Sequence, residues 1–272
     1  MAISTASVNI LGVGVHSVDM RAALNLAHDA IETRSRGYMC FTGVHGIMEA
    51  QRDVRLREAL NNAMMNLPDG MPTVWTGRIR GHKQMGRVFG PDFMLNFCAE
   101  SVQRGYTHFL YGGAPGVAAA LRENLLARFP GLRIVGTFTP PFRELNESEE
   151  RELVELLATL RPDCLWVGLS TPKQERFMSR YVDRTQATLM LGVGAAFDYH
   201  TGRIKDAPEW VKNSGLQWVH RLIQEPKRLW KRYLVNNPMF VLNLVSQLAG
   251  LRMYPPPHRR AESRTQSEWS SQ

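Results

Sequence analysis

The stretch FLYGGAPGVAAALRENL, residues 109–125, decides the fold class because it joins an apolar run to a glycine turn and then to a helix. After Gly116, apolar residues recur at three- and four-residue intervals, which is typical of one helix face. A strand that passes directly into a helix is one half of a strand–helix–strand unit. Such units build parallel sheets with crossover helices.

Six similar apolar runs occur elsewhere, and helical spacing follows each of them. The runs are VNILGVGV (8–15), YMCFTGV (38–44), TVWTG (73–77), LRIVGTF (132–138), CLWVGLS (164–170) and ATLMLGVGA (187–195). Helical spacing is clearest in 54–67, 116–129, 147–160 and 172–184. We therefore expect an α/β fold with a Rossmann-like, mainly parallel sheet flanked by helices. Several runs end in glycine or a small polar residue, and such carboxyl ends line the ligand crevice of open parallel sheets.

The pattern changes near residue 206, where strand-like runs stop. We expect an α/β catalytic domain over residues 1–206, a helical, basic segment over 207–254, and a disordered, proline-rich and then polar tail over 255–272. Since 44% of the 272 residues are hydrophobic, the chain can bury a core, and disorder of the whole chain is excluded.

The composition limits the partners and the compartment. A net charge of +8 favours an anionic partner, which is nucleic acid, anionic lipid or a phosphorylated substrate. The three cysteines are odd in number and show no close pairing, which predicts buried free thiols in a reducing cytoplasm. The N-terminus lacks the basic region of a signal peptide, and no uninterrupted apolar run reaches about 18 residues. Any membrane contact is therefore expected to be peripheral.

The glycine turn in the opening stretch offers backbone N–H groups and a helix N-terminus to an anion such as a diphosphate. The candidate residues are Gly112, Gly113, Pro115 and Gly116. The turn has neither the Gly-Lys-Ser/Thr of a Walker A loop nor a strict Gly-x-Gly-x-x-Gly. A turn that only connects a strand to a helix fits the sequence equally well.

A second candidate is Asp69, in a Pro-Asp-Gly turn between the expected helix 54–67 and the expected strand 73–77. Pro-Asp-Gly is an ordinary turn sequence, so a purely structural role is a strong alternative. A carboxylate at the mouth of a strand can instead act as general base on a sugar hydroxyl. The pattern alone does not decide between the two.

Two further turns carry polar candidates. In GLSTPKQERF, Ser170 or Thr171 is placed to cap the next helix, with Glu175 near capping-box spacing, but capping does not explain Gln174. In GVGAAFDYH, Asp198 follows a glycine-rich strand end. It can accept hydrogen bonds from a ribose or base, or serve as a structural cap.

The sequence shows no pattern of metal ligands. The eight histidines are scattered without His-x-x-x-His spacing, and there is no Asp-x-Asp pair. A metal-independent mechanism without a cofactor is therefore expected.

Taken together, six motifs resemble the WecG/TagA/CpsF glycosyltransferases, glycosyltransferase family 26. The motifs are PDGMPTVW (68–75), RVFGPD (87–92), LYGGAPGVAAAL (110–121), VGLSTPKQE (167–175), GVGAAFDYHTGRIKDAP (192–208) and QWVHRLIQEPKRLWKRYL (217–234). The resemblance runs from about residue 8 to about residue 240. It implies a bacterial inverting, metal-independent transferase with an α/β fold of its own. Such enzymes move a sugar, often N-acetylmannosamine, from a UDP donor to a polyprenyl-diphosphate-linked saccharide at the cytoplasmic face of the membrane.

The resemblance also implies roles for residues of the α/β part. Asp69 matches the proposed catalytic base, and Arg87 matches an arginine proposed to touch the acceptor or the departing phosphates. Gln174 matches the glutamine of the Pro-x-Gln-Glu motif. Asp198 matches the aspartate of the Gly-x-Phe-Asp motif near the nucleotide.

In the C-terminal segment, the resemblance implies an appendage that binds the membrane and completes the site. Arg221 and Arg228 match arginines thought to hold the diphosphate, with Lys231 or Arg232 as a third candidate. Here Trp, Leu, Ile, Tyr and Phe alternate with Arg and Lys, a composition typical of an interfacial helix on anionic lipid. A packed terminal helix with solvated charges is the alternative.

One departure from the family concerns the donor sugar. Members commonly carry Thr-x-Asn beside the sugar, whereas this chain has CFTGVHG. When the chains are aligned on the segment VHGIMEA that follows, Phe41 and Gly43 take the positions of the family's Thr and Asn. Thr42 then lies one position away and remains a candidate substrate-binding residue. Glucose, as in relatives that build exopolysaccharide repeats, is therefore an alternative to N-acetylmannosamine.

Two other classes of protein compete with a transferase. The charge and the basic, aromatic segment fit a nucleic-acid-binding α/β protein, but no RNP, KH or helix-turn-helix pattern is present, so we expect no nucleic-acid partner. The glycine turns fit an NAD-dependent oxidoreductase, but the full fingerprint and its acidic residue are missing. The sequence leaves a homo-oligomer open.

Overall fold

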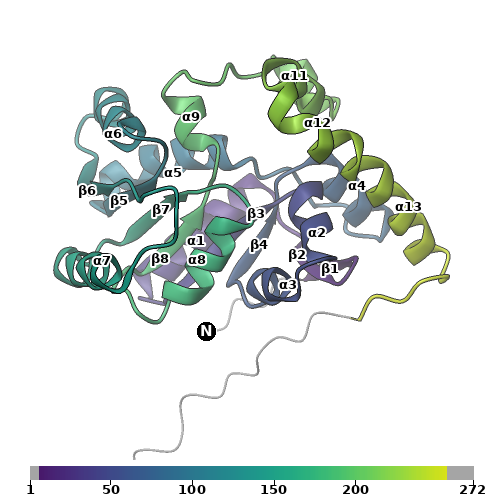
Figure 1. Cartoon of the computed structure of the whole chain (residues 1–272), viewed down its shortest axis with the longest axis horizontal. Helices are drawn as coiled ribbons and strands as arrows, with labels where there is room; N and C mark the ends of the chain where they lie inside the picture. The colour runs from purple at the N-terminus through teal and green to yellow at the C-terminus, as the bar shows by residue number, and fades with distance from the viewer. Residues whose placement is uncertain (1–5, 256–272) are drawn as a thin grey trace, which may run out of the picture.

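The computed structural model describes residues 6–255, apart from the side chains of Glu209 and Asn213. Its centre is a six-stranded parallel sheet in the order β4-β3-β8-β7-β5-β6 (Figure 1). The strands are β3 (Gly37–Thr42), β4 (Met65–Pro68), β5 (Thr107–Gly112), β6 (Arg133–Phe138), β7 (Cys164–Gly168) and β8 (Leu189–Gly192). The predicted α/β fold with a mainly parallel sheet is confirmed.

Helices cover both faces of the sheet, which explains why most residues of its strands are apolar. One core contains α1 (Met20–Glu32), α5 (Gly90–Arg104) and α6 (Val117–Arg128), and the other contains α2 (Val44–Ala50), α3 (Val54–Asn61), α7 (Glu147–Leu160) and α8 (Lys173–Tyr181). Side chains of β3 alternate between them. Met39 and Phe41 lie in the first core, and Tyr38 and Cys40 lie in the second.

Residues 8–15, predicted as one strand, form a separate antiparallel hairpin instead. Strand β1 (Ser7–Ile10) pairs with β2 (Val13–His16) outside the parallel sheet. At the turn, Leu11 and Gly12 have positive φ angles of 50° and 83°. Two consecutive residues with positive φ form a tight turn whose twist matches that of antiparallel strands. The direction of the chain is therefore reversed at Leu11 and Gly12.

The predicted secondary structure around Asp69 is wrong. The stretch 65–68, expected at the end of a helix, is strand β4, and the expected strand 73–77 lies inside helix α4 (Met71–Ile79). Strand β4 is fully buried, and its short apolar run continues the helical spacing of α3, which explains the wrong prediction. Pro72 in the first turn favours α4 as a helix, and two of its threonine hydroxyls donate to carbonyls of the preceding turn.

Within the described part of the chain, four helices follow residue 206, as the loss of strand-like runs predicts. They are α10 (Glu209–Asn213), α11 (Gln217–Gln224), α12 (Pro226–Leu234) and α13 (Asn236–Leu248). In Figure 1, α11 and α12 lie above one edge of the body, and α13 runs down beside α2. Helix α13 is anchored by the buried Phe240 and by Gln247, whose amide accepts from the Leu11 N–H and donates to the Asn9 carbonyl.

All three cysteines are buried free thiols, as predicted. Within residues 6–255, no helix combines the length and the apolar composition needed to cross a bilayer. Of the predicted tail 255–272, only Pro255 belongs to the described residues.

The carboxyl ends of the parallel strands meet at one edge of the sheet. From the neighbouring strands β5 and β7, the chain leads to β6 on one side and to β8 on the other. Connections that diverge in this way leave a crevice between them, where open α/β sheets bind ligands. A ligand site is therefore expected at this edge.

Candidate active site

A cavity of about 860 Å³ opens at this edge of the sheet. Residues that follow β3, β4, β5, β7 and β8 line it, and α11 and α12 contribute an opposing wall. The cavity brings together these residues predicted from the sequence: Asp69, Arg87, Gly113, Gln174, Asp198, Arg221, Arg228 and Arg232. Its volume is in the range of cavities that hold a small ligand.

Asp69 follows β4 directly and lies at the floor of the cavity. Its backbone N–H donates to the Thr42 carbonyl at 3.2 Å, and its Oδ1 accepts from the Gly90 N–H at 3.2 Å. Burial raises the pKa of this carboxyl to about 6, against the opposing effects of Arg87 and Arg232. At pH 7 the group is therefore mostly ionised and more basic than an ordinary aspartate, which suits a general base.

Arg87 connects the Asp69 turn to helix α11. Its Nε donates to the Asp69 carbonyl at 3.2 Å, and its Nη2 donates to Gln217 Oε1. The guanidinium also lies 4.3 Å from the centre of the Phe89 ring. Arg87 therefore holds a positive charge beside Asp69 and fixes the start of α11 over the cavity.

Two arginines of the C-terminal helices share one carboxylate. Glu225 Oε2 accepts from Arg221 Nη2 at 2.8 Å and from Arg228 Nη2 at 2.9 Å. The Arg221 guanidinium also lies 5.5 Å from the centre of the Tyr199 ring. Glu225 and Tyr199 were not predicted. The sequence could have identified Glu225 as a partner of both arginines, because it lies four residues after Arg221 and three before Arg228, the spacing of helical ion pairs.

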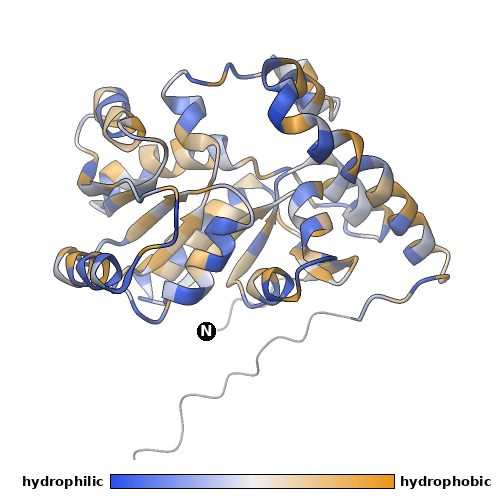
Figure 2. Cartoon of the chain, in the orientation of Figure 1, coloured by the Kyte–Doolittle hydropathy of each residue, from blue (hydrophilic) through white to orange (hydrophobic). Residues whose placement is uncertain are grey.

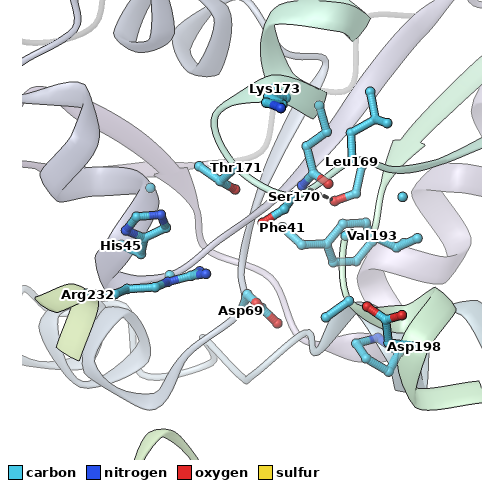
Figure 3. Close-up of a pocket in the computed structure, with 18 of the residues that line it drawn as sticks. Phe41, His45, Asp69, Leu169, Ser170, Thr171, Lys173, Val193, Asp198 and Arg232 are labelled. Atoms are coloured by element: carbon cyan, nitrogen blue, oxygen red, sulfur yellow. Dashed lines mark hydrogen bonds between the residues drawn. The ribbon is translucent and has the colours of Figure 1, made fainter. Parts of the chain in front are cut away.

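Arg232 is the third arginine of this wall, and among the described residues its guanidinium forms no ion pair. Its Nε is buried without a hydrogen-bond partner. Burial, together with the like charges of Arg221 and Arg228, lowers its pKa. In Figure 3 the side chain extends between His45 and Asp69. The nearby carboxylate of Asp69 interacts with Arg232 but forms no ion pair with it. Because a desolvated cation without a directly paired counter-ion is unfavourable, Arg232 indicates that the cavity binds an anion.

Gln174 lies buried in the first turn of α8 and lines the cavity. Its Nε2 donates to the Gly192 carbonyl at 2.7 Å and to Glu175 Oε1 at 3.1 Å, which leaves its own Oε1 without a partner among the described residues. Thr171 donates to the same Glu175 oxygen at 2.8 Å. Pro172 is the N-cap residue of α8, and no side chain caps the helix. The capping interpretation of this turn is therefore wrong, and the network fixes the Gln174 amide.

Asp198 lies on α9 (Ala196–His200), and in Figure 3 Asp69 stands between it and Arg232. Helix α9 has no side-chain cap, so the structural alternative for Asp198 is not realised. Burial raises the pKa of this carboxyl, whereas Arg203 and Arg228 lower it. Asp198 is thus a hydrogen-bond acceptor on the side of the cavity opposite Arg232.

The glycine turn after β5 is engaged in close packing. The Gly113 N–H donates to the Gly168 carbonyl at 3.0 Å, and a Cβ on Gly112 would lie 2.6 Å from that same oxygen. Gly112 has a φ of 126°, which other residues rarely adopt. Gly113 lines the cavity, whereas Gly112, Pro115 and Gly116 do not. These contacts support the structural interpretation of the turn.

The loop after β3 presents the neighbours of Thr42 to the cavity. Thr42 is buried, and its hydroxyl has no partner among the described residues. Phe41, Gly43 and His45 line the cavity, and a Cβ on Gly43 would meet nothing within 4 Å. Burial and the charge of Arg232 lower the pKa of His45 to about 3, so the imidazole is neutral at pH 7.

The loop after β6 forms a part of the wall that the sequence analysis missed. Residues 140–145, PPFREL, line the cavity, and the side chain of Phe142 is 83% exposed there. Arg143 is held by two hydrogen bonds to Glu149 in the first turn of α7. The sequence could have predicted that this loop lines the cavity, because it follows the carboxyl end of a parallel strand, as the other lining loops do.

Arginine side chains supply most of the positive charge of the cavity, and Lys173 and Lys212 also line it. Among residues 6–255, His, Cys, Asp and Glu form no group of three that could hold a metal ion. The arrangement combines a carboxylate of raised pKa with guanidinium groups from the C-terminal helices. It can take a proton from a hydroxyl while it binds phosphate oxygens.

Comparison with known proteins gives a consistent result. Residues 8–253 match the glycosyl transferase WecG/TagA/CpsF family. A similar protein of Bacillus spizizenii is 29% identical over 80% of this chain and 81% of its own length, and one of Bacillus subtilis is 26% identical over 74% and 77%. Both are described as N-acetylglucosaminyldiphosphoundecaprenol N-acetyl-β-D-mannosaminyltransferases.

Proposed function

The chain belongs to the glycosyl transferase WecG/TagA/CpsF family, and on this premise we propose that it transfers a sugar from a UDP-sugar to a polyprenyl-diphosphate-linked saccharide. The transfer inverts the anomeric centre, needs no metal ion and serves bacterial surface or exopolysaccharide synthesis. One observation carries the proposal: the carboxyl of Asp69, with a pKa raised to about 6, lies in one cavity with Arg232, which forms no ion pair among residues 6–255.

In the proposed reaction, Asp69 accepts the proton of the acceptor hydroxyl as that oxygen attacks C1 of the donor sugar. The bond between C1 and the UDP oxygen breaks on the opposite face, and its electron pair stays on the diphosphate. A single displacement of this kind inverts C1. The raised pKa of Asp69 supports this role because a stronger base takes the proton more readily near neutral pH.

The charge that develops on the departing diphosphate needs fixed positive groups. Arg221, Arg228 and Arg232 line the same cavity, and only one carboxylate, Glu225, forms ion pairs with them among the described residues. They therefore retain net positive charge. Preorganised guanidinium groups in a partly desolvated site stabilise such charge without the help of an ion.

The donor and the cation requirement can be tested in one assay. We expect one UDP-sugar, N-acetylmannosamine or glucose, to be transferred to a synthetic prenyl-diphosphate glycan at least about tenfold faster than others, because pocket contacts of a few kcal/mol discriminate between sugars. EDTA should leave the rate unchanged, and NMR of the product should show the inverted anomer. Failure of every UDP-sugar, or a rate that EDTA abolishes and a divalent cation restores, would overturn the proposal.

We place the enzyme at the cytoplasmic face of the membrane, in peripheral contact through α13. An apolar row on this helix is exposed by between 44% and 61%, and consists of Val241, Leu242, Val245 and Leu248. Figure 2 shows hydrophobic residues along α13 and alternating hydrophilic and hydrophobic residues on α11 and α12. An exposed apolar row next to cations supports contact with anionic lipid.

Leu242→Glu combined with Val245→Glu should lower co-sedimentation with anionic liposomes by about tenfold or more, since both exposed apolar side chains lose their favourable transfer into lipid. Val54→Glu on α3 is the matched control, because Val54 is 56% exposed. Point variants are preferable to truncation at residue 206, which would also remove the buried Phe240 and the arginines. If the double variant sediments like the wild type, α13 is not the membrane contact.

A further inference from the structure

A second pocket of about 690 Å³ adjoins the cavity. It lies between α12 and the loop 169–173, and α2 and the turn after it supply the remaining wall. We call it the α12 groove. The α12 groove and the cavity meet at the residues that line both, which are His45, Leu169, Ser170, Thr171, Lys173, Arg228 and Arg232.

The α12 groove is strongly cationic. Five of its lining residues are Arg52, Lys173, Arg228, Lys231 and Arg232, against one acidic residue, Glu49. Within residues 6–255, the ion pairs of the chain include none from Arg52, Lys173 or Lys231. Arg52, Lys173 and Lys231 reach the α12 groove from the turn after α2, from α8 and from α12, and none of them is paired with an acidic residue among the described residues. The α12 groove is therefore complementary to an anion.

One side of the α12 groove is apolar. Leu229, Trp230 and Val235 line it, and Trp230 and Val235 are 47% and 42% exposed. The Lys231 ammonium lies 5.5 Å from the centre of the Trp230 ring, so a cation stands directly beside an exposed aromatic surface. A ligand that fits this surface carries a concentrated negative charge next to an apolar chain.

We propose that the α12 groove binds the diphosphate and the first isoprene units of the lipid-linked acceptor. This inference rests on the proposed function, and it assigns a role to Arg52, Trp230 and Lys231, which line the α12 groove and not the cavity. The reacting hydroxyl of the acceptor must reach Asp69 in the cavity. If the acceptor saccharide extends from Asp69 past the residues shared by the two pockets, its diphosphate lies in the α12 groove.

The position of the α12 groove also fits the path of the prenyl chain. Its apolar residues lie on α12 and at the start of α13. Leu234, one helical turn after Trp230, is 57% exposed, and the exposed apolar row of α13 follows. A prenyl chain that leaves the α12 groove here therefore stays on apolar surface until it reaches the proposed membrane face.

Binding of farnesyl diphosphate, measured by calorimetry on the full chain, tests this inference without any transfer reaction. We expect the wild type to bind farnesyl diphosphate more tightly than either inorganic diphosphate or farnesol, because the α12 groove contacts both parts of the ligand. Arg52→Gln combined with Lys231→Gln should weaken binding by about tenfold or more, since two charge-assisted contacts are lost. Trp230→Ala should weaken binding of farnesyl diphosphate but not of inorganic diphosphate.

Lys227→Gln is the matched control for charge, because Lys227 lies on α12 and lines neither pocket. Unchanged affinity in the Arg52/Lys231 double variant and in the Trp230 variant would overturn the inference, as would a wild type that binds inorganic diphosphate equally well. If the variants lose affinity for farnesyl diphosphate while no UDP-sugar is transferred, the α12 groove is still supported as a prenyl-diphosphate site. Only the proposed transfer reaction would then be rejected.

Discussion

Replacing Asp69 with asparagine should lower kcat by about 10²–10⁴-fold, the usual contribution of a general base. The asparagine oxygen can still accept the Gly90 N–H bond that the Asp69 carboxylate accepts, so the turn should keep its shape. It cannot take the proton of the acceptor hydroxyl. The measurement is kcat for sugar transfer at saturating donor and acceptor, together with the thermal unfolding midpoint of both proteins.

The unfolding midpoint separates chemistry from folding. The pKa of Asp69 is raised to about 6 in the folded chain, so its ionised form destabilises the folded state at pH 7. This destabilisation decreases as the pH falls below the pKa of the folded chain, and it is gone below the lower pKa of the unfolded chain. The uncharged asparagine should therefore unfold at the same or a higher temperature than the wild type at pH 7. Asp183→Asn, at an exposed position outside the cavity lining, is the control and should keep wild-type turnover. Wild-type turnover in Asp69→Asn would exclude Asp69 as the base.

Replacing Arg232 with glutamine should lower kcat by about 10²–10³-fold, the range seen when one fixed charge-stabilising donor is removed. Arg232→Lys should recover only part of this loss, because an ammonium group cannot reproduce the planar fork of donors. Since Arg232 lowers the pKa of Asp69, its removal should also shift the acid limb of the pH–rate profile to higher pH. If the Arg232→Gln variant keeps wild-type kcat and an unshifted acid limb of the pH–rate profile, Arg232 takes no part in the reaction.

Most of the fold followed from the sequence because strand-to-helix alternation is a local signal. The strands predicted from five runs, including FLYGG and CLWVG, all belong to the parallel sheet. The errors arose where local signals conflict. Strand β4 continues the helical spacing of α3, and the β-branched residues after Pro72 imitate a strand inside α4.

The candidate site was predictable to the extent that strand ends meet at one edge. Asp69, Gln174 and Asp198 all follow strand ends, and the structure brings them into one cavity. The residues that complete the site depend on tertiary packing, which short-range spacing does not encode. The loop 140–145 and the α12 groove, for example, form only when elements distant in the sequence pack together.

The role of Asp69 as the base can be measured through the pH dependence of kcat/KM, for the wild type and for the residual activity of Asp69→Asn. Wild-type kcat/KM should fall as the pH drops through about 6, since the base becomes protonated, and Asp69→Asn should lack this acid limb. An acid limb that persists unchanged near pH 6 in Asp69→Asn would exclude Asp69, because another group would then be the base.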